Sequence, residues 1–217
     1  MSFYADSHRA LQDEFGRRAL ADLLEAAIIH PALAPDEQAF IESQDMFFLS
    51  TVDECGRPTV SYKGGAPGFV RAPDPNTILF PCYDGNGMYY SLGNIEAAAH
   101  VGLLFIDFAV PHRLRIQGEA SLVRDPDVLT AFPGAELVVR VTPTEIFVNC
   151  GRYIHKRIAA ERSPYVPDAQ GHAPVPAWKQ IDFVQPVLDP AERDRVAASG
   201  GPITPEDYGQ RVAAGRP

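Results

Sequence analysis

The spacing of hydrophobic residues changes from a helical to a strand-like pattern after the first fifth of the chain. Over residues 11–29, apolar side chains recur every three or four positions, which predicts a helix that ends before Pro31. Pro35, followed by acidic residues, predicts a second, short helix that runs to about Ser43. Beyond it, short β-prone runs alternate with turn residues. We therefore expect an N-terminal helical segment over residues 1–44.

Six segments after this point have the alternation or the apolar content of β-strands. Gly56 and Pro58 lie in a turn that joins the first two segments into a hairpin, and Pro143 marks a bend or bulge in the last. The fourth segment is almost wholly apolar, as in a strand buried on both faces. Strands joined this closely favour antiparallel pairing, so we expect a mainly β barrel or sandwich with short helices. The six predicted strands cover residues 46–52, 59–63, 76–83, 101–108, 112–123 and 135–150.

The composition changes again near Arg162. A stretch rich in Pro, Gly and polar residues predicts an extended C-terminal arm over residues 161–217, which leaves residues 45–160 as the central domain. Residues 189–200 are compatible with a short helix inside this arm. The arm either packs on a partner subunit or is a loosely ordered tail, and the sequence leaves both alternatives open.

Charge and composition exclude several classes of function. The chain of 217 residues is 46% hydrophobic and carries a formal net charge of −9, which disfavours wide contact with nucleic acid or an anionic membrane. A phosphate-bearing small molecule, which needs only local cations, stays compatible with this charge. The chain contains no run of about 18 apolar residues, so no membrane span is expected. The first residues lack the pattern of a secretory signal, so a cytoplasmic location is expected. The three cysteines form no CxxC pair and the six histidines form no HxxxH pair, so neither a disulfide framework nor a metal site is expected.

Four stretches carry candidate chemistry, and each also has an ordinary structural reading. A strand ends at Lys63, and two glycines, Gly64 and Gly65, follow it. Glycines can adopt positive φ, and exposed N–H groups in such a turn beside a cation form a site that binds an anion. The alternative is a simple hairpin exit in which the glycines serve only the backbone geometry. After the turn at residues 84–87, Ser91 or Asn94 is a candidate cap for the start of a helix, whose first N–H groups would favour a phosphate. The alternative is an ordinary strand–turn–helix connection.

The other two stretches contribute donors and cations late in the chain. Arg115 and Gln117 share one face of an alternating strand, where they either reach a planar polar ligand or face solvent. Arg152 and Tyr153 begin a cationic cluster after the last predicted strand, which either completes an anion site or is a solvated surface.

Taken in order, the stretches "STVDECGRPTVSYKGGAPGFVR", "ILFPCYDGNGMYYSLGNI", "VGLLFIDF", "RLRIQGEASL" and "IFVNCGRYI" resemble the pyridoxamine 5′-phosphate oxidase-like family of FMN-binding split barrels. The resemblance covers about residues 36–156. It implies a six-stranded antiparallel split β-barrel that forms a homodimer, with FMN in a groove at the dimer interface. Lys63 would then meet the FMN phosphate, and backbone groups of Ser61 and Tyr62 would face the flavin ring or its ribityl chain. The cofactor-binding residues implied by the resemblance are Ser61, Tyr62, Lys63, Pro81, Cys82, Tyr83, Asn86, Met88, Ser91, Arg115, Gln117, Arg152 and Tyr153.

The sequence also departs from the oxidase that gives this family its name. Asn86, Gly87 and Met88 stand where the oxidase has an Arg-Lys pair for the FMN phosphate, and Pro58 stands where it has an arginine. Vitamin B6 oxidation is therefore disfavoured. The resemblance implies an FMN-dependent oxidoreductase that transfers hydride between the flavin and an unidentified small substrate, and it assigns no catalytic side chain. The alternatives are a non-enzymatic flavin-binding, storage or redox-sensing protein, and a structural dimer with an empty groove.

Overall fold

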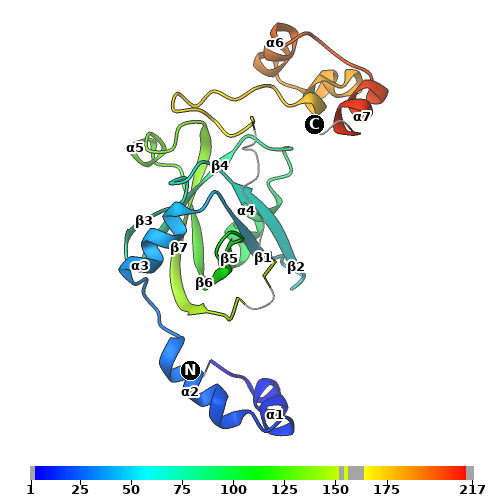
Figure 1. Ribbon diagram of the computed structural model, residues 1–217. Coiled ribbons are helices and arrows are strands. Elements are labelled where there is room, and N and C mark those ends of the chain that lie inside the picture. The colour runs from blue at the N-terminus through cyan, green and yellow to red at the C-terminus, as the bar shows by residue number, and fades with distance from the viewer. Residues whose placement is uncertain (1–2, 152–153, 156–163, 214–217) are drawn as a thin grey trace. The chain divides into compact units, whose positions relative to one another are not determined.

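Seven strands form one antiparallel sheet in the computed structural model, which describes residues 3–151, 154–155 and 164–213 (Figure 1). The hydrogen-bonded order is β2-β1-β5-β6-β7-β4-β3. All six pairings are antiparallel, which confirms the mainly β class and the antiparallel prediction. The strands are β1 (Met46–Val52), β2 (Pro58–Gly64), β3 (Arg71–Asp74), β4 (Thr77–Tyr83), β5 (His100–Asp107), β6 (His112–Val123) and β7 (Ala135–Val148).

The predicted number of six strands is wrong, because β3 adds a seventh. This strand has only four residues, one of them Pro73, so it lacks the alternation that identifies a strand from sequence. It forms because it pairs with β4 at the end of the sheet, where a residue without an N–H is tolerated. Among the described residues β2 and β3 end the strand order and do not pair with each other, so hydrogen bonds do not close the sheet.

The inner face of the sheet buries an aromatic and aliphatic core. The Phe47 ring stacks on Phe105 at a centroid distance of 4.9 Å and meets the edge of Phe80 at 5.0 Å. In β5 the outer residues Leu104 and Ile106 are only half-buried, so the prediction of a strand buried on both faces is wrong for the single chain. The apolar run of β5 therefore gives the outer face of the sheet an apolar surface as well.

A bulge bends the longest strand pair where the sequence predicted one. Gln117 of β6 lies opposite Glu145 of β7, whereas the next residue, Gly118, lies opposite Pro143, so one residue of β7 is extra. A Cβ on Gly118 would lie 2.4 Å from the carbonyl oxygen of Thr142, so only glycine fits at this position.

The helices in residues 1–160 confirm one N-terminal prediction and correct the other. α3 (Pro35–Ser43) is the predicted short helix, and α4 (Tyr90–Ala98) contacts β1 and β6. The single helix predicted over residues 11–29 is two helices, α1 (Asp6–Glu14) and α2 (Arg18–Ile28), because Gly16 adopts a φ of +61° between them. The short helix α5 (Pro126–Leu129) lies between β6 and β7.

Residues 161–217 form a second compact unit. Its described part contains the 3₁₀ helices η1 (Ala177–Gln180) and η2 (Asp182–Val187) and the α-helices α6 (Pro190–Ala198) and α7 (Pro205–Ala213). The sequence predicted an extended arm here, with a helix compatible only with residues 189–200. The helices bury Ile181, Leu188 and Val196, apolar residues that are too widely spaced among prolines to give a periodic signal. No helix in the described parts of the chain is long and apolar enough to cross a membrane.

Candidate functional site

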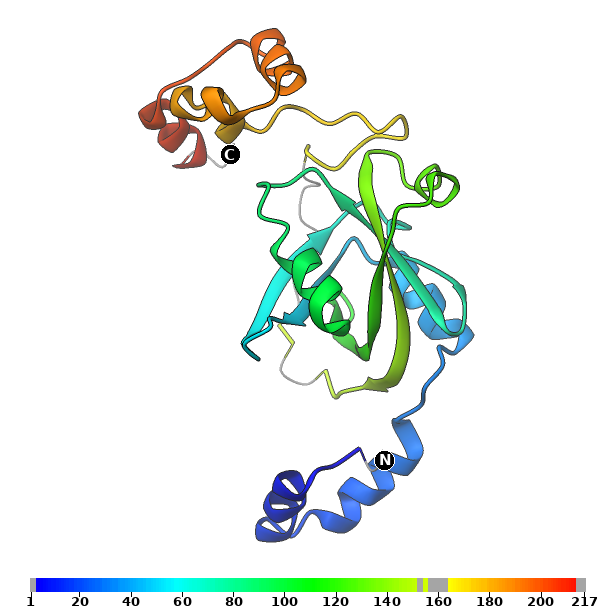
Figure 2. The ribbon, with the colours of Figure 1, turned by 180° about the vertical axis from the view of Figure 1, so that it is seen from behind.

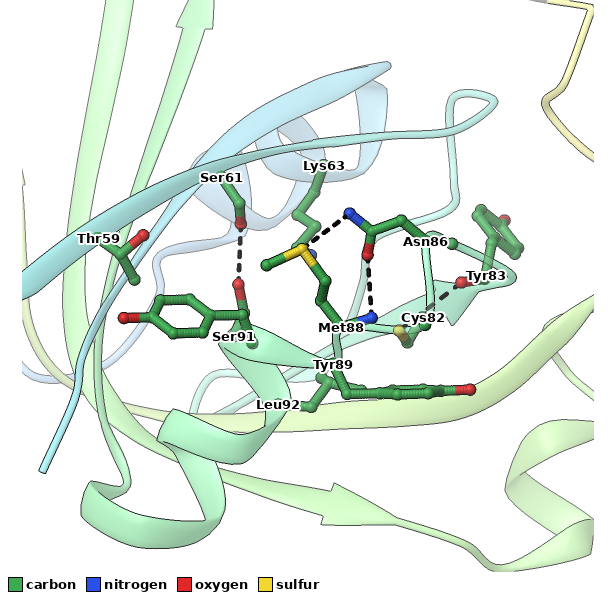
Figure 3. Close-up of a pocket in the computed structure, with 13 residues that line it drawn as sticks. Thr59, Ser61, Lys63, Cys82, Tyr83, Asn86, Met88, Tyr89, Ser91 and Leu92 are labelled. Atoms are coloured by element: carbon green, nitrogen blue, oxygen red, sulfur yellow. Dashed lines mark hydrogen bonds between the residues drawn. The ribbon is translucent and has the colours of Figure 1, made fainter. Parts of the chain in front are cut away.

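A pocket opens beside the edge strand β2, where the sheet is not continued. Three alternate residues of β2, Thr59, Ser61 and Lys63, point to the same side as the core residues of β1 with which they pair. Because β2 is the last strand of the order, these polar side chains line the rim of the core instead of being buried in it. They form one wall of a pocket of about 280 Å³ (Figure 3).

The opposite wall comes from the end of β4 and the turn that leads into α4. Cys82 lies at the strand end, and Asn86 and Met88 lie in the turn. The Asn86 side chain shapes this turn, because its Oδ1 accepts the N–H of Met88 at 3.1 Å and its Nδ2 lies 3.2 Å from the Met88 sulfur. The Ser61 and Ser91 hydroxyl oxygens lie 3.2 Å apart and join the two walls (Figure 3).

The first turn of α4 faces the pocket without a side-chain cap. Its N-cap is Tyr89, which adopts a left-handed conformation with a φ of 47° and has no side-chain cap hydrogen bond, so the predicted caps Ser91 and Asn94 are wrong. The Tyr89 hydroxyl donates to Glu136 Oε2 at 2.8 Å, which helps to hold this strained residue. The backbone N–H groups of the first turn therefore lack a side-chain acceptor and give the pocket a positive helix end.

Asn94 has a structural role behind the pocket. Its side chain is buried and its Nδ2 donates to the Thr51 hydroxyl at 3.0 Å, which is also buried. This hydrogen bond ties α4 to β1 and so fixes the first turn of the helix opposite β2. The bond thus positions the two walls of the pocket relative to each other.

The charge in the pocket comes from one lysine. Among the described residues that line it, Lys63 is the one cation, and neither a carboxylate nor a histidine is present. Lys63 forms no salt bridge within the described part of the chain. Burial raises the pKa of the Cys82 thiol, and the nearby Lys63 charge opposes this shift. The pocket therefore offers an ammonium group, three serine or threonine hydroxyl groups and a helix N-terminus, a donor set suited to a phosphate.

Seven of the predicted cofactor-binding residues line this pocket: Ser61, Lys63, Cys82, Tyr83, Asn86, Met88 and Ser91. Tyr62 is 63% exposed on the opposite face of β2, and Pro81 is buried in β4 outside the lining. Arg115 and Gln117 are exposed on the outer face of β6, so one chain does not bring them to its own pocket. The predicted residues Arg152 and Tyr153 lie outside the described residues.

Sequence reasoning missed Thr59 and misread the two glycines after Lys63. Thr59 lines the pocket, and its alternation with Ser61 and Lys63 could have identified it. Gly64 and Gly65 do not adopt positive φ. A Cβ on Gly65 would lie 2.4 Å from the Phe69 ring, so this glycine is needed for packing and not for an anion nest. In the described residues no group of His, Cys, Asp and Glu side chains could hold a metal ion.

In a comparison with known proteins, residues 33–150 match the family model described as pyridoxamine 5′-phosphate oxidase. Three solved structures are similar to this chain. HupZ from Group A Streptococcus is 18% identical, with a TM-score of 0.43 over 54% of this chain and 94% of the other. An F420 reductase is 20% identical, with a TM-score of 0.40 over 52% and 98%. HutZ, a heme storage protein from Vibrio cholerae, is 22% identical, with a TM-score of 0.39 over 54% and 94%. No curated protein sequence matches the chain.

Proposed function

Because the chain belongs to the pyridoxamine 5′-phosphate oxidase family, we propose that it binds FMN and transfers hydride between the flavin and a small organic substrate. The observation that carries this proposal is the donor set of the pocket. The pocket combines Lys63, three serine or threonine hydroxyl groups and the first turn of α4, and among the described residues that line it no carboxylate competes for the cation. This combination suits the phosphate end of the cofactor.

The chain's own residues would hold the cofactor in a defined orientation. Lys63 would contact a phosphate oxygen, and the hydroxyl groups of Thr59, Ser61 and Ser91 would donate to the phosphate or the ribityl chain. When bound, the flavin supplies the hydride chemistry, and the protein supplies binding and orientation. Met88 and Tyr89, both exposed at the rim, offer an apolar surface beside the pocket that would exclude water from a planar ring.

The pocket accounts for only part of an FMN molecule, and we propose that a second copy of the chain completes the site in a homodimer. A pocket of about 280 Å³ lies below the usual range for whole ligand sites, roughly 300–1,000 Å³. Arg115 and Gln117 lie on the outer face of the sheet, together with Val60 and Tyr62, which are 66% and 63% exposed. This outer face would meet the partner and present Arg115 and Gln117 to the partner's cofactor.

A non-enzymatic flavin-binding, storage or redox-sensing role is the second candidate, and one observation favours it. The described residues that line the pocket include no aspartate, glutamate or histidine, so they supply no carboxylate or imidazole for proton transfer, and their titratable groups are those of Lys63, Cys82 and three tyrosines. Asn86, Gly87 and Met88 occupy the position of the oxidase's phosphate-binding cations, which continues to disfavour vitamin B6 oxidation. The two candidates share the cofactor site and differ in turnover.

The test begins with the cofactor and then asks for turnover. Denatured protein is analysed by mass spectrometry for released FMN, and the cofactor-free chain is titrated with FMN by fluorescence. Release or saturable binding of FMN supports the cofactor site, and the absence of both refutes it. Loaded protein is then mixed anaerobically with NADH or NADPH: multiple-turnover oxidation of the nicotinamide with an added acceptor supports an oxidoreductase, whereas a flavin that is not reduced supports the binding role.

A further inference from the structure

The helix pair α1–α2 presents its apolar residues to solvent. The two helices lie side by side (Figures 1 and 2), and neither contains a buried residue among those that the structure describes. Five large apolar side chains on the pair each expose between 40% and 67% of their surface. These five residues, called the leucine stripe below, are Leu11, Phe15, Leu20, Leu23 and Leu24.

The leucine stripe has the spacing of a packing surface. In α2, Leu20, Leu23, Leu24 and Ala27 follow the i, i+3, i+4, i+7 pattern by which a helix packs against another element. An exposed helix pair normally turns such a stripe toward its own core and its charges toward water. In this pair the stripe faces solvent within the single chain, so the pattern predicts a partner that the chain itself does not supply.

Salt bridges between charged side chains join the two helices, and none of the five residues of the stripe is charged. Arg9 bridges Asp22 at 2.5 Å and Glu25 at 3.1 Å. The Arg18 Nε donates to Asp13 Oδ1 at 2.7 Å. These bridges hold α1 against α2 through polar contacts, so the apolar side chains remain available for an external contact.

The size of the stripe matches one side of a protein–protein contact. From the exposed fractions, the five residues together present roughly 500 Å² of surface, which is in the range of the largest and often functional apolar patch of a monomer, about 300–600 Å². A standard interface buries about 800 Å² on each partner, of which somewhat more than half is apolar. The stripe therefore provides the apolar area that one partner of a stable dimer needs.

We propose that the leucine stripe is buried against the same stripe of a second copy of this chain. Two copies of an uncharged, leucine-rich surface can meet without like-charge repulsion, and a two-fold contact uses the same patch on both copies. A membrane surface fits less well, because residues 6–28 contain five carboxylates and three arginines, whereas interfacial helices are rich in Lys and Arg. The contact does not depend on FMN binding and adds to the dimer face proposed above.

The first experiment adds charge to the stripe of the full-length chain. In Leu20→Glu/Leu23→Glu, association measured by sedimentation velocity over a range of protein concentrations should weaken by at least about 100-fold, because each carboxylate would have to be buried at the contact. Phe183→Glu/Val187→Glu, which adds two charges at exposed apolar positions of the C-terminal unit, should associate like the wild type. Unchanged association of the stripe variant overturns the proposal.

The second experiment leaves the stripe nearly intact, so it does not depend on how the charged variant folds. In a chain with Cys55→Ser and Cys150→Ser, a Leu23→Cys variant treated with a short bifunctional maleimide should give a cross-linked dimer. Val187→Cys in the same background is the control. Cross-linking at Leu23 no greater than at Val187 overturns the proposal. So does a monomeric wild type that cosediments with phosphatidylcholine–phosphatidylglycerol vesicles, since the stripe would then bind lipid.

Discussion

Removing the Lys63 ammonium group tests the central assignment of the pocket. Lys63→Met keeps the length and apolar stem of the side chain and deletes one charge. Lys63 is half-buried at the pocket wall, and within the described residues no acidic side chain forms a salt bridge with it. Such a charge-assisted hydrogen bond to phosphate is worth about 1.5–3 kcal/mol. Because one tenfold change in affinity corresponds to 1.4 kcal/mol, the dissociation constant for FMN should rise about 10- to 100-fold.

Fluorescence titration of the cofactor-free variant with FMN measures this change, and riboflavin provides an internal comparison. Riboflavin lacks the phosphate, so Lys63→Met should barely alter its affinity. Arg140→Met is the matched control, because it removes an exposed cation from the outer side of β7 in the same sheet. Equal affinities of wild type and Lys63→Met for FMN would refute the phosphate role of Lys63. An equal loss for riboflavin would instead indicate damage to the pocket.

The same variant has a readout that needs no cofactor. The Lys63 charge opposes the burial that raises the pKa of the Cys82 thiol, so Lys63→Met should raise this pKa further. Alkylation of Cys82, followed by peptide mass spectrometry across alkaline pH, should therefore require higher pH in the variant. An unchanged profile would mean that the Lys63 ammonium group does not act on the interior of the pocket.

Three further predictions concern the scaffold. Thr51→Val should destabilise the fold by about 1–3 kcal/mol in urea unfolding, because the buried Asn94 amide loses its acceptor. Adding Asn94→Leu should recover part of this loss, and additive effects of the two substitutions would contradict the coupling. Gly118→Ala should lower the free energy of unfolding by about 3 kcal/mol or more, because the new Cβ would meet a backbone carbonyl oxygen. In Gly102→Ala the nearest contact of the new Cβ is 3.6 Å, so the change should stay within about 1 kcal/mol. Equal losses in the two variants would contradict the bulge geometry. The pKa of Asp53 is lowered from 3.8, mainly because its carboxylate accepts a hydrogen bond from the backbone N–H of Arg57. The ionised Asp53 therefore stabilises the fold fully above pH 3.8, and this stabilisation disappears as pH falls through the lowered pKa. The difference in melting temperature between wild type and Asp53→Ala should shrink over that range, and a constant difference would contradict this.

The sequence was sufficient for the features that depend on local pattern. Alternation or apolar content identified six of the strands, and alternation placed Arg115 and Gln117 on the face opposite Leu114 and Ile116. The bulge near Pro143 followed from the missing N–H of proline. The residues that line the pocket came mostly from the family resemblance, since no local motif distinguishes Ser61 or Cys82 from other strand residues.

Features that depend on tertiary contacts were missed. Strand β3 exists because β4 offers it a pairing edge, which a four-residue run cannot signal. The start of α4 was misplaced because Tyr89, a poor cap by propensity, adopts a left-handed conformation with its hydroxyl on Glu136. The positive φ of Gly16 divides the N-terminal helix. The glycine itself was a sequence signal for a break, but the apolar spacing around it outweighed this signal in the prediction.

The edge position of β2 has a consequence for how this fold can change over evolution. Thr59, Ser61 and Lys63 face the pocket from a strand with neighbours on one side only, and none of the three is fully buried. Substitutions there would cost little packing energy, because the core residues lie on the next strand. Ligand preference can therefore diverge through these three positions while the sheet that carries them stays the same.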